Sequence, residues 1–229
     1  MLKQQGKSIK ESIFVEGYAL NCTVADQSMP KFMKNAKIAC LDFNLQKVKM
    51  GHGVKVVIED TNELEQIRER EISLLKDTCE LVIKSGANVV LVTKGIDDIA
   101  LKYFSEAGIM AVRRVAKSDL RKIARATGAT IVSNFTDTEN EEGKESFESS
   151  NLGSAQLVEQ KRIADDELIF ISGCSTSKTA SIVFRGPNSL MLDEMERSMH
   201  DAICIVKRTL ESKLVVPGGK KNDSFKTFI

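Results

Sequence analysis

Several residue types and patterns are scarce or missing in these 229 residues. Tryptophan is absent, aromatic residues make up only 5% of the chain, and the formal net charge is +1. Neither a platform for stacking bases nor a strong field favouring nucleic acid or an anionic membrane is therefore indicated. No apolar run approaches the roughly 18 residues of a membrane span, and the N-terminus has no signal-peptide core. We therefore expect a cytoplasmic protein without a nucleic-acid or membrane partner.

Residues that usually build metal centres and active sites are also poorly placed. The five cysteines are odd in number and none forms a CxxC pair, which predicts small buried apolar residues in a reducing compartment, without zinc or disulfides. The two histidines, His52 and His200, lie far apart in the sequence. The chain also contains no P-loop, GxGxxG, nucleophile elbow or HExxH, so a self-contained enzyme is not visible.

What the chain does contain is an alternation of apolar strands and helical patterns. We predict strands at residues 36–43, 53–60, 87–93, 109–115 and 129–135, with helices at about 61–85, 96–108 and 117–128. Continuous apolar strands separated by helices predict an α/β fold with a βαβαβ parallel sheet covered on both faces. Three more strands, at 155–163, 167–174 and 179–186, follow at hairpin spacing.

The first of these helices is unusually long. Asp60 can cap its start with Glu63 as the reciprocal partner, and Gly86 can end it. About 24 residues would give a length of roughly 36 Å. The first half is highly charged, and the apolar stripe is interrupted at Glu71. Two interpretations stay open: a helix whose first half projects from the body, and an ordinary amphipathic surface helix.

Charged residues mark the starts and faces of the shorter helices. Asp97 and Asp98 fall in the first turn of their helix, where the helix dipole favours capping over acid–base chemistry. The helix at 117–128 carries a basic face, which suits either solvent or a binding partner.

The final helix, at about 190–212, places one aspartate opposite its apolar stripe. At about 100° per residue that stripe should face the core, and it consists of Leu192, Met195, Met199, Ile203, Val206 and Leu210. Asp201 lies on the other side, four residues after Arg197. The residues alone therefore predict a surface aspartate in a weak ion pair.

Long stretches of this sequence resemble the group II chaperonins. They include GANVVLVTKGIDDIALKYFSEAGIMAVRRVAKSDLRKIARATGA and DEMERSMHDAICIVKRTLESKLVVPGG, and they cover nearly everything from Lys7 to Gly219 in family order. Within that family the chain is most similar to the alpha-type subunits of the eukaryotic cytosolic chaperonin. The resemblance implies an apical domain at 17–185 with a helical protrusion at about 60–86. It places intermediate-domain segments at 1–16 and 186–216, and an equatorial stub with an unrelated tail at 217–229.

The resemblance also implies roles for particular residues. Asp201 matches the intermediate-domain aspartate that positions the water attacking the γ-phosphate of ATP, a role that suits the positioning chemistry of phosphoryl transfer. Gly218 and Gly219 match a glycine run that approaches the nucleotide, although Lys220 stands where another glycine is expected. Unfolded clients would contact the outward face of the helix at 117–128. The residues implied for that face are Lys117, Leu120, Arg121, Ala124 and Arg125.

The family's equatorial domain, with its GDGTT phosphate loop and metal-binding aspartate, has no match in this sequence. We therefore expect a fragment that is inactive alone, although the complete subunit would use ATP and Mg²⁺. One function is the client-binding part of a folding machine, in which paralogous subunits form a hetero-oligomeric double ring that folds non-native proteins such as cytoskeletal clients. A second is a free-standing α/β protein-binding module without ATPase coupling. A third, a small-molecule enzyme, is disfavoured by the missing glycine fingerprint and nucleophile–base pair.

Overall fold

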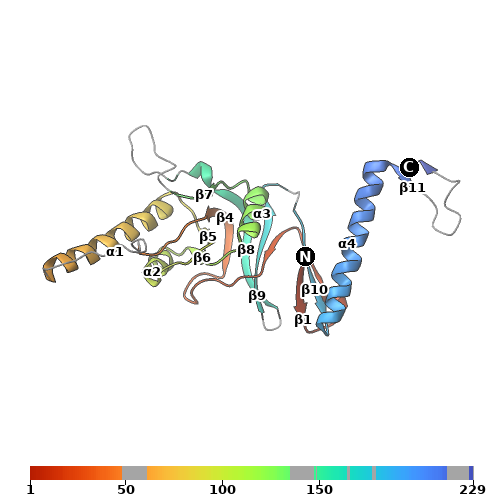
Figure 1. The fold of residues 1–229 in the computed structure, drawn as a ribbon, viewed down its shortest axis with the longest axis horizontal. Helices are drawn as coiled ribbons and strands as arrows, with labels where there is room; N and C mark the ends of the chain where they lie inside the picture. Colours follow the sequence, from red (N-terminus) through yellow and green to blue (C-terminus); the bar gives the residue numbers. More distant parts are fainter. Residues whose placement is uncertain are drawn as a thin grey trace, which may run out of the picture. The chain divides into compact units, whose positions relative to one another are not determined.

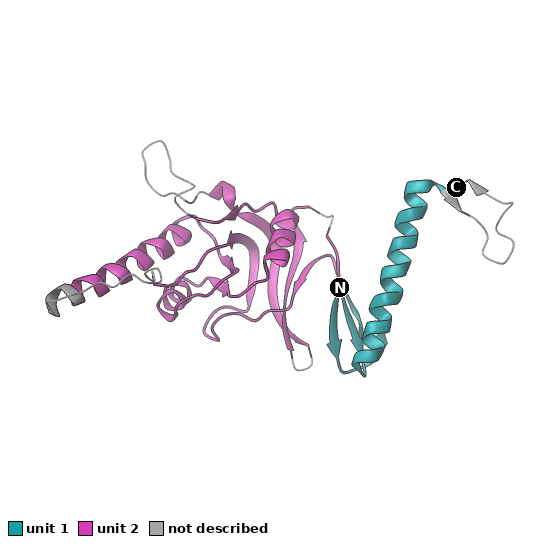
Figure 2. Cartoon of the chain, in the orientation of Figure 1, with its two compact units in different colours: residues 1–13, 182–229 teal, residues 14–181 magenta. Residues whose placement is uncertain are grey.

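The computed structural model describes residues 1–47, 61–134, 147, 149–163, 166–176, 179–215 and 227–228. They fall into two compact units, coloured separately in Figure 2: one combines residues 1–13 with 182–229, and the other comprises residues 14–181. The strand predicted at 53–60, the cap at Asp60, and Gly218 and Gly219 lie outside the described residues.

The larger unit is built on a seven-stranded mixed sheet with the order β3-β9-β8-β4-β5-β6, and β7 pairs with β4. Its strands are β3 (Gly17–Leu20), β4 (Phe32–Leu41), β5 (Val89–Val92), β6 (Met110–Val112), β7 (Ile131–Val132), β8 (Gly153–Ile163) and β9 (Asp166–Cys174). Strand β4 runs parallel to β5 and β7, and β5 runs parallel to β6. The predicted parallel α/β sheet is confirmed, although its strands are shorter than expected.

Three helices connect these parallel strands: α1 (Thr61–Lys84), α2 (Asp98–Glu106) and α3 (Lys117–Thr127). Alternate residues of β5 point to opposite faces, as the pleat of a strand requires. Val90 and Val92 belong to the core that α1 and α2 cover, whereas Val89 and Leu91 belong to the core that α3 covers. This two-sided burial explains why the sequence of β5 is apolar throughout instead of alternating.

Among the side chains of α1 that the structure describes, those that pack on the sheet lie in its second half. Leu75, Cys79 and Val82 are buried, whereas residues 65–70 are exposed or only partly buried, and Leu74 is 52% exposed. Figure 1 shows α1 extending beyond the sheet. The structure therefore agrees with the projecting interpretation of this helix.

The antiparallel part of the prediction is half right. Strands β8 and β9 form the expected hairpin, with register from Ala155 opposite Cys174 to Ile163 opposite Asp166. The third strand, β10 (Ser181–Gly186), does not continue it but lies between β1 (Leu2–Gln5) and β2 (Ile13–Val15) in a separate sheet. Its partners lie at the other end of the chain, which hairpin spacing cannot reveal.

The smaller unit combines this three-stranded sheet with the long helix α4 (Ser189–Ser212). The short strands β11 (Leu214–Val215) and β12 (Thr227–Phe228) pair with each other, and a 3-10 turn lies at Ile9–Glu11. Another 3-10 turn, at Ser149–Asn151, lies in the larger unit. Among the described residues, none of the helices has the length and apolarity that spanning a membrane requires.

Candidate functional site

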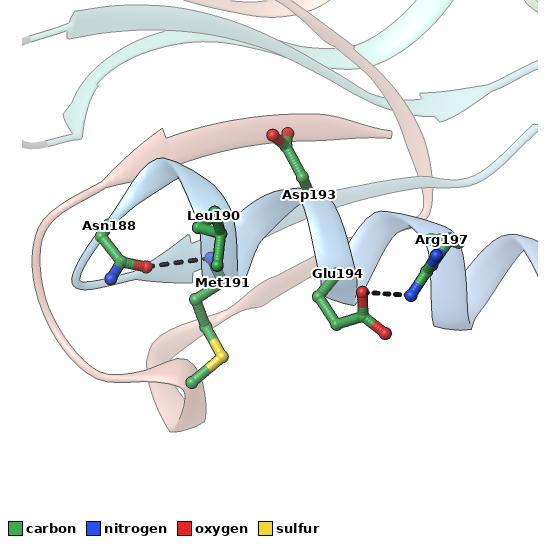
Figure 3. Close-up of a pocket in the computed structure, with 6 residues that line it drawn as sticks. All are labelled: Asn188, Leu190, Met191, Asp193, Glu194 and Arg197. Carbon is green, nitrogen blue, oxygen red and sulfur yellow. Dashed lines mark hydrogen bonds and ion pairs between the residues drawn. The ribbon is translucent and has the colours of Figure 1, made fainter.

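The start of α4 is firmly attached to the smaller unit. The side chain of Asn188 accepts a hydrogen bond from the backbone N–H of Met191 at 2.9 Å and so caps the helix (Figure 3). Leu192 is 2% exposed and packs over Gly186, where a Cβ atom would come within 3.2 Å of it.

Lys3 joins the N-terminal strand to the first turns of α4. Its Nζ atom lies 2.7 Å from Glu196 and 2.9 Å from Asp193, and these carboxylates raise the pKa of the ammonium group. The pairs are solvent-exposed, so they fix geometry more than they add stability. Together with the cap and Leu192, they hold the base of the helix.

Beyond these turns α4 is exposed, and this corrects the predicted core stripe. Met195 and Met199 are only partly buried, and the apolar residues further along the helix face solvent, up to 72% exposure at Leu210. The helical spacing was read correctly, but among the described residues only β1 packs substantially against α4. An amphipathic stripe predicts that a partner is required, not that the same chain supplies it.

Asp201 is exposed on this free part of α4, as predicted. The expected ion pair with Arg197 does not form, because the guanidinium group of Arg197 donates to Glu194 at 2.6 Å (Figure 3). Glu194, and to a lesser degree Asp201, raises the pKa of Arg197. Spacing alone could not decide between the partners at i−3 and i+4, since both lie on the same helix face.

A shallow hollow lies beside the first turns of α4, with a volume of about 460 Å³. Asn188, Leu190, Met191, Asp193, Glu194 and Arg197 line it (Figure 3). Asp201 is not among these residues. Two of the charged groups in the hollow already neutralise each other, so it offers little to fix a ligand.

The basic helix α3 presents a different face from the one implied by the resemblance. Lys117, Arg121 and Arg125 are exposed at four-residue spacing and therefore lie along one side. Leu120 and Ala124 are only 1% and 6% exposed and belong to the core under α3. Their predicted outward orientation was wrong, because the five residues straddle the boundary between the two sides of the helix.

The start of α3 is tied to the carboxyl ends of two parallel strands. The Nζ atom of Lys117 lies 2.5 Å from Asp42, which follows β4, and Thr93, which follows β5, donates to the same carboxylate at 2.7 Å. Lys117 and then Thr93 hold the pKa of Asp42 below its usual value, with a smaller contribution from Lys94. Asp42 was missed in the sequence, although its position directly after a buried strand was a usable signal.

The other end of α3 is held by the segment that follows β9. Gly128 takes a left-handed conformation (φ 78°) that ends the helix. The hydroxyl of Thr176 donates to the backbone carbonyl of Ala126, and its backbone N–H donates to the same carbonyl at 3.1 Å. With both ends fixed, the exposed cations of α3 stand on a rigid support.

The cysteines are free, and burial raises the pKa of the Cys40 and Cys79 thiols to about 12. Cys204 departs from the prediction because it is exposed on α4, with its Sγ atom 3.5 Å from Nε2 of His200. Across the part of the chain that the structure describes, no group of three or more His, Cys, Asp or Glu side chains could hold a metal ion. Asp97 caps α2 by accepting from the backbone N–H of Ile99 at 3.2 Å, as expected.

A model of the TCP-1/cpn60 chaperonin family matches residues 1–220. The chain belongs to this family. The chaperonin chain is 60% identical over 219 residues to T-complex protein 1 subunit alpha of Dictyostelium discoideum, a match that covers 96% of the chain and 39% of the relative. The corresponding protein of Arabidopsis thaliana is 57% identical, with 96% and 40% covered. The thermosome subunit alpha of Archaeoglobus fulgidus is 40% identical, with 95% and 38% covered.

The fold of the chaperonin chain is similar to that of an open-state monomer of a group II chaperonin from Methanococcoides burtonii. The TM-score is 0.74 at 30% identity, and the match covers 94% of the chain and 46% of that monomer. The resemblance to alpha-type group II chaperonin subunits and the mixed α/β fold are therefore confirmed. The chaperonin chain spans about two fifths of the length of the curated relatives that it matches.

Proposed function

We propose that this chain is the client-binding part of a subunit of an ATP-dependent cytosolic chaperonin. In this proposal residues 17–185 are the apical domain, α1 is its helical protrusion, and residues 1–16 and 186–216 belong to the intermediate domain. The complete subunit would join paralogous subunits in a cytoplasmic double ring. Family membership and the similarity to alpha subunits support this proposal.

The exposed face of α3 carries the client-binding part of the proposal. Lys117, Arg121 and Arg125 lie on one side of a helix whose two ends are fixed and whose inner side is fully packed. Long basic side chains expose a charge on an apolar stem, so they can contact mixed surfaces of non-native chains. We now place Leu120 and Ala124 beneath this face as its support.

Asp201 is proposed to position the water that attacks ATP in the complete subunit, with Gly218 and Gly219 near the nucleotide. The described residues do not by themselves fit ATP and Mg²⁺, because Asp201 is exposed and no group of metal-ligating side chains accompanies it. We therefore derive no catalytic step from this chain and expect it to be inactive alone. A nucleotide titration tests this, and binding of ATP at micromolar concentration would contradict it.

Suppression of aggregation tests the client-binding role. The chain should slow aggregation of a chemically denatured protein without ATP, and Arg121→Ala with Arg125→Ala should weaken that effect. Lys102→Ala on α2 is the matched control, since Lys102 is exposed in the same unit and lies outside α3. Equal suppression by the α3 variant and the control would refute the assignment of α3. No suppression by the unmodified chain would refute client binding itself.

A further inference from the structure

We propose that the exposed cations of α3 continue onto two neighbouring loops, and that this combined surface selects acidic polypeptide segments. This inference rests on the proposed client-binding function and names the class of client segment. We call this set of residues the basic surface. It consists of Lys94, Arg113, Arg114, Arg121 and Arg125.

The two loops lie together at the carboxyl edge of the parallel sheet. Lys94 follows β5, Arg113 and Arg114 follow β6, and the backbone N–H of Arg114 donates to the carbonyl of Lys94 at 3.1 Å. Arg114 has a positive φ of 57°, the left-handed conformation that non-glycine residues adopt mainly in turns. The loop leads directly into α3, which begins at Lys117 and carries Arg121 one turn later.

Asp42 links the loops to α3. It bonds Thr93 next to Lys94 and also pairs with Lys117 at the first position of α3. Lys94 is close enough to contribute to the lowered pKa of Asp42. The loop after β5, the end of β4 and the start of α3 thus meet around one carboxylate.

The cations of the basic surface have no carboxylate within ion-pair distance among the described residues, unlike Lys117 and Lys122, which pair with Asp42 and Asp119. Asp119 is further engaged with Tyr18, whose pKa is raised by burial first and then by this carboxylate. Asp97 is occupied in capping α2. Asp42, Asp119 and Asp97 are therefore engaged elsewhere, and within the part of the chain that the structure describes no carboxylate neutralises the basic surface.

The chemistry of the surface favours carboxylates on a polypeptide. Four of its five residues, Arg113, Arg114, Arg121 and Arg125, are arginines, whose planar guanidinium groups match carboxylates with two parallel hydrogen bonds. Nucleic acid is a poorer fit, because the chain has a net charge of only +1 and no tryptophan. The partner of the basic surface is therefore a segment rich in Asp and Glu within a non-native protein.

Fluorescence anisotropy with labelled short peptides tests this on the whole chain. One peptide is acidic, and its matched analogue replaces each Glu and Asp with Gln and Asn while keeping the apolar residues. The acidic peptide should bind about tenfold more tightly at low salt, and the difference should shrink at 0.15 M salt, where the Debye length is about 8 Å. The variant Arg113→Gln with Arg114→Asn should reduce this preference severalfold, since each exposed charge pair contributes modestly.

The controls separate this inference from the proposed function. Lys102→Gln should leave the preference unchanged, and circular dichroism should show the same folded content for both variants. If the chain suppresses aggregation but binds both peptides equally, or if the loop variant keeps the full preference, the inference is overturned while client binding stands. If an oligothymidine binds more tightly than the acidic peptide at equal salt, a polypeptide partner is overturned. If neither peptide binds and aggregation is not suppressed, the proposed function itself fails.

Discussion

Replacing Leu120 by alanine should destabilise the larger unit without removing any group from its exposed surface. Leu120 is 1% exposed and belongs to the core cluster between α3 and the sheet, which also contains Ile38 and Leu91. Truncation of a fully buried leucine costs the transfer of its methyl groups and leaves a cavity, about 3 kcal/mol in well-packed cores. For a unit of this size that corresponds to a fall of about 6–12 °C in the midpoint of thermal unfolding.

The assay is thermal and urea unfolding followed by circular dichroism, with Arg121→Ala as the matched control on the next residue. Arg121 is exposed, so its truncation should change the free energy of unfolding by less than about 0.5 kcal/mol. Leu120→Met keeps the volume and should also cost little. If Leu120→Ala unfolds at the same temperature as the unmodified chain, or if Arg121→Ala destabilises as much, the assignment of inner and outer sides of α3 is wrong.

Three further predictions concern other elements. Asp42→Asn should cost about 1 kcal/mol at pH 7, because it removes a carboxylate whose pKa the ion pair with Lys117 lowers. That stabilisation is present above the unfolded pKa of about 4 and is lost as the pH falls through the lower folded pKa, so urea unfolding should show the gap closing in acid. Gly17→Ala should destabilise by about 3 kcal/mol or more, since its Cβ would lie 1.9 Å from the carbonyl oxygen of Ile171, and a normal unfolding midpoint would contradict this. Ile205→Ser on α4 should leave the unfolding midpoint unchanged but reduce binding of an apolar dye, and a large loss of stability would mean that Ile205 is packed.

The parallel part of the fold was predictable because its signals are local. Several features can be recognised from a few neighbouring residues: the apolar runs of β5 and β6, the glycine that ends α3, and the capping Asp97. The pairing of β10 with β1 was not predictable, since residues 6–180 separate the two strands and β1 itself was not predicted as a strand. Strand partners depend on tertiary packing, which periodicity alone does not record.

The candidate site was predictable to a smaller extent. The resemblance implied an outward face of α3 that includes the buried Leu120 and Ala124, and a helical wheel, which gives neighbouring positions but not where solvent begins, could not correct it. The same wheel described the stripe of α4 correctly and still failed to predict its exposure. In both cases the missing information is what packs against the helix.

The pairing of Leu2 with Val183 also imposes an order on synthesis and folding. At 5–20 residues per second, the N-terminal strand waits roughly ten seconds or more on the ribosome before its partner exists. Residues 17–181 lie between β1 and the rest of β10 in the sequence, and we call them the insertion. The hydroxyl of Ser181 donates to the carbonyl of Gly17 at 3.0 Å, so the folded insertion holds its own two ends together. Once the insertion has folded, the entropic cost of closing the β1–β10 pair is that of a short loop instead of a very long one. A destabilising substitution in the core of the insertion, such as one beneath α3, should therefore also weaken the β1-β10-β2 sheet, although the substituted residue lies outside that sheet.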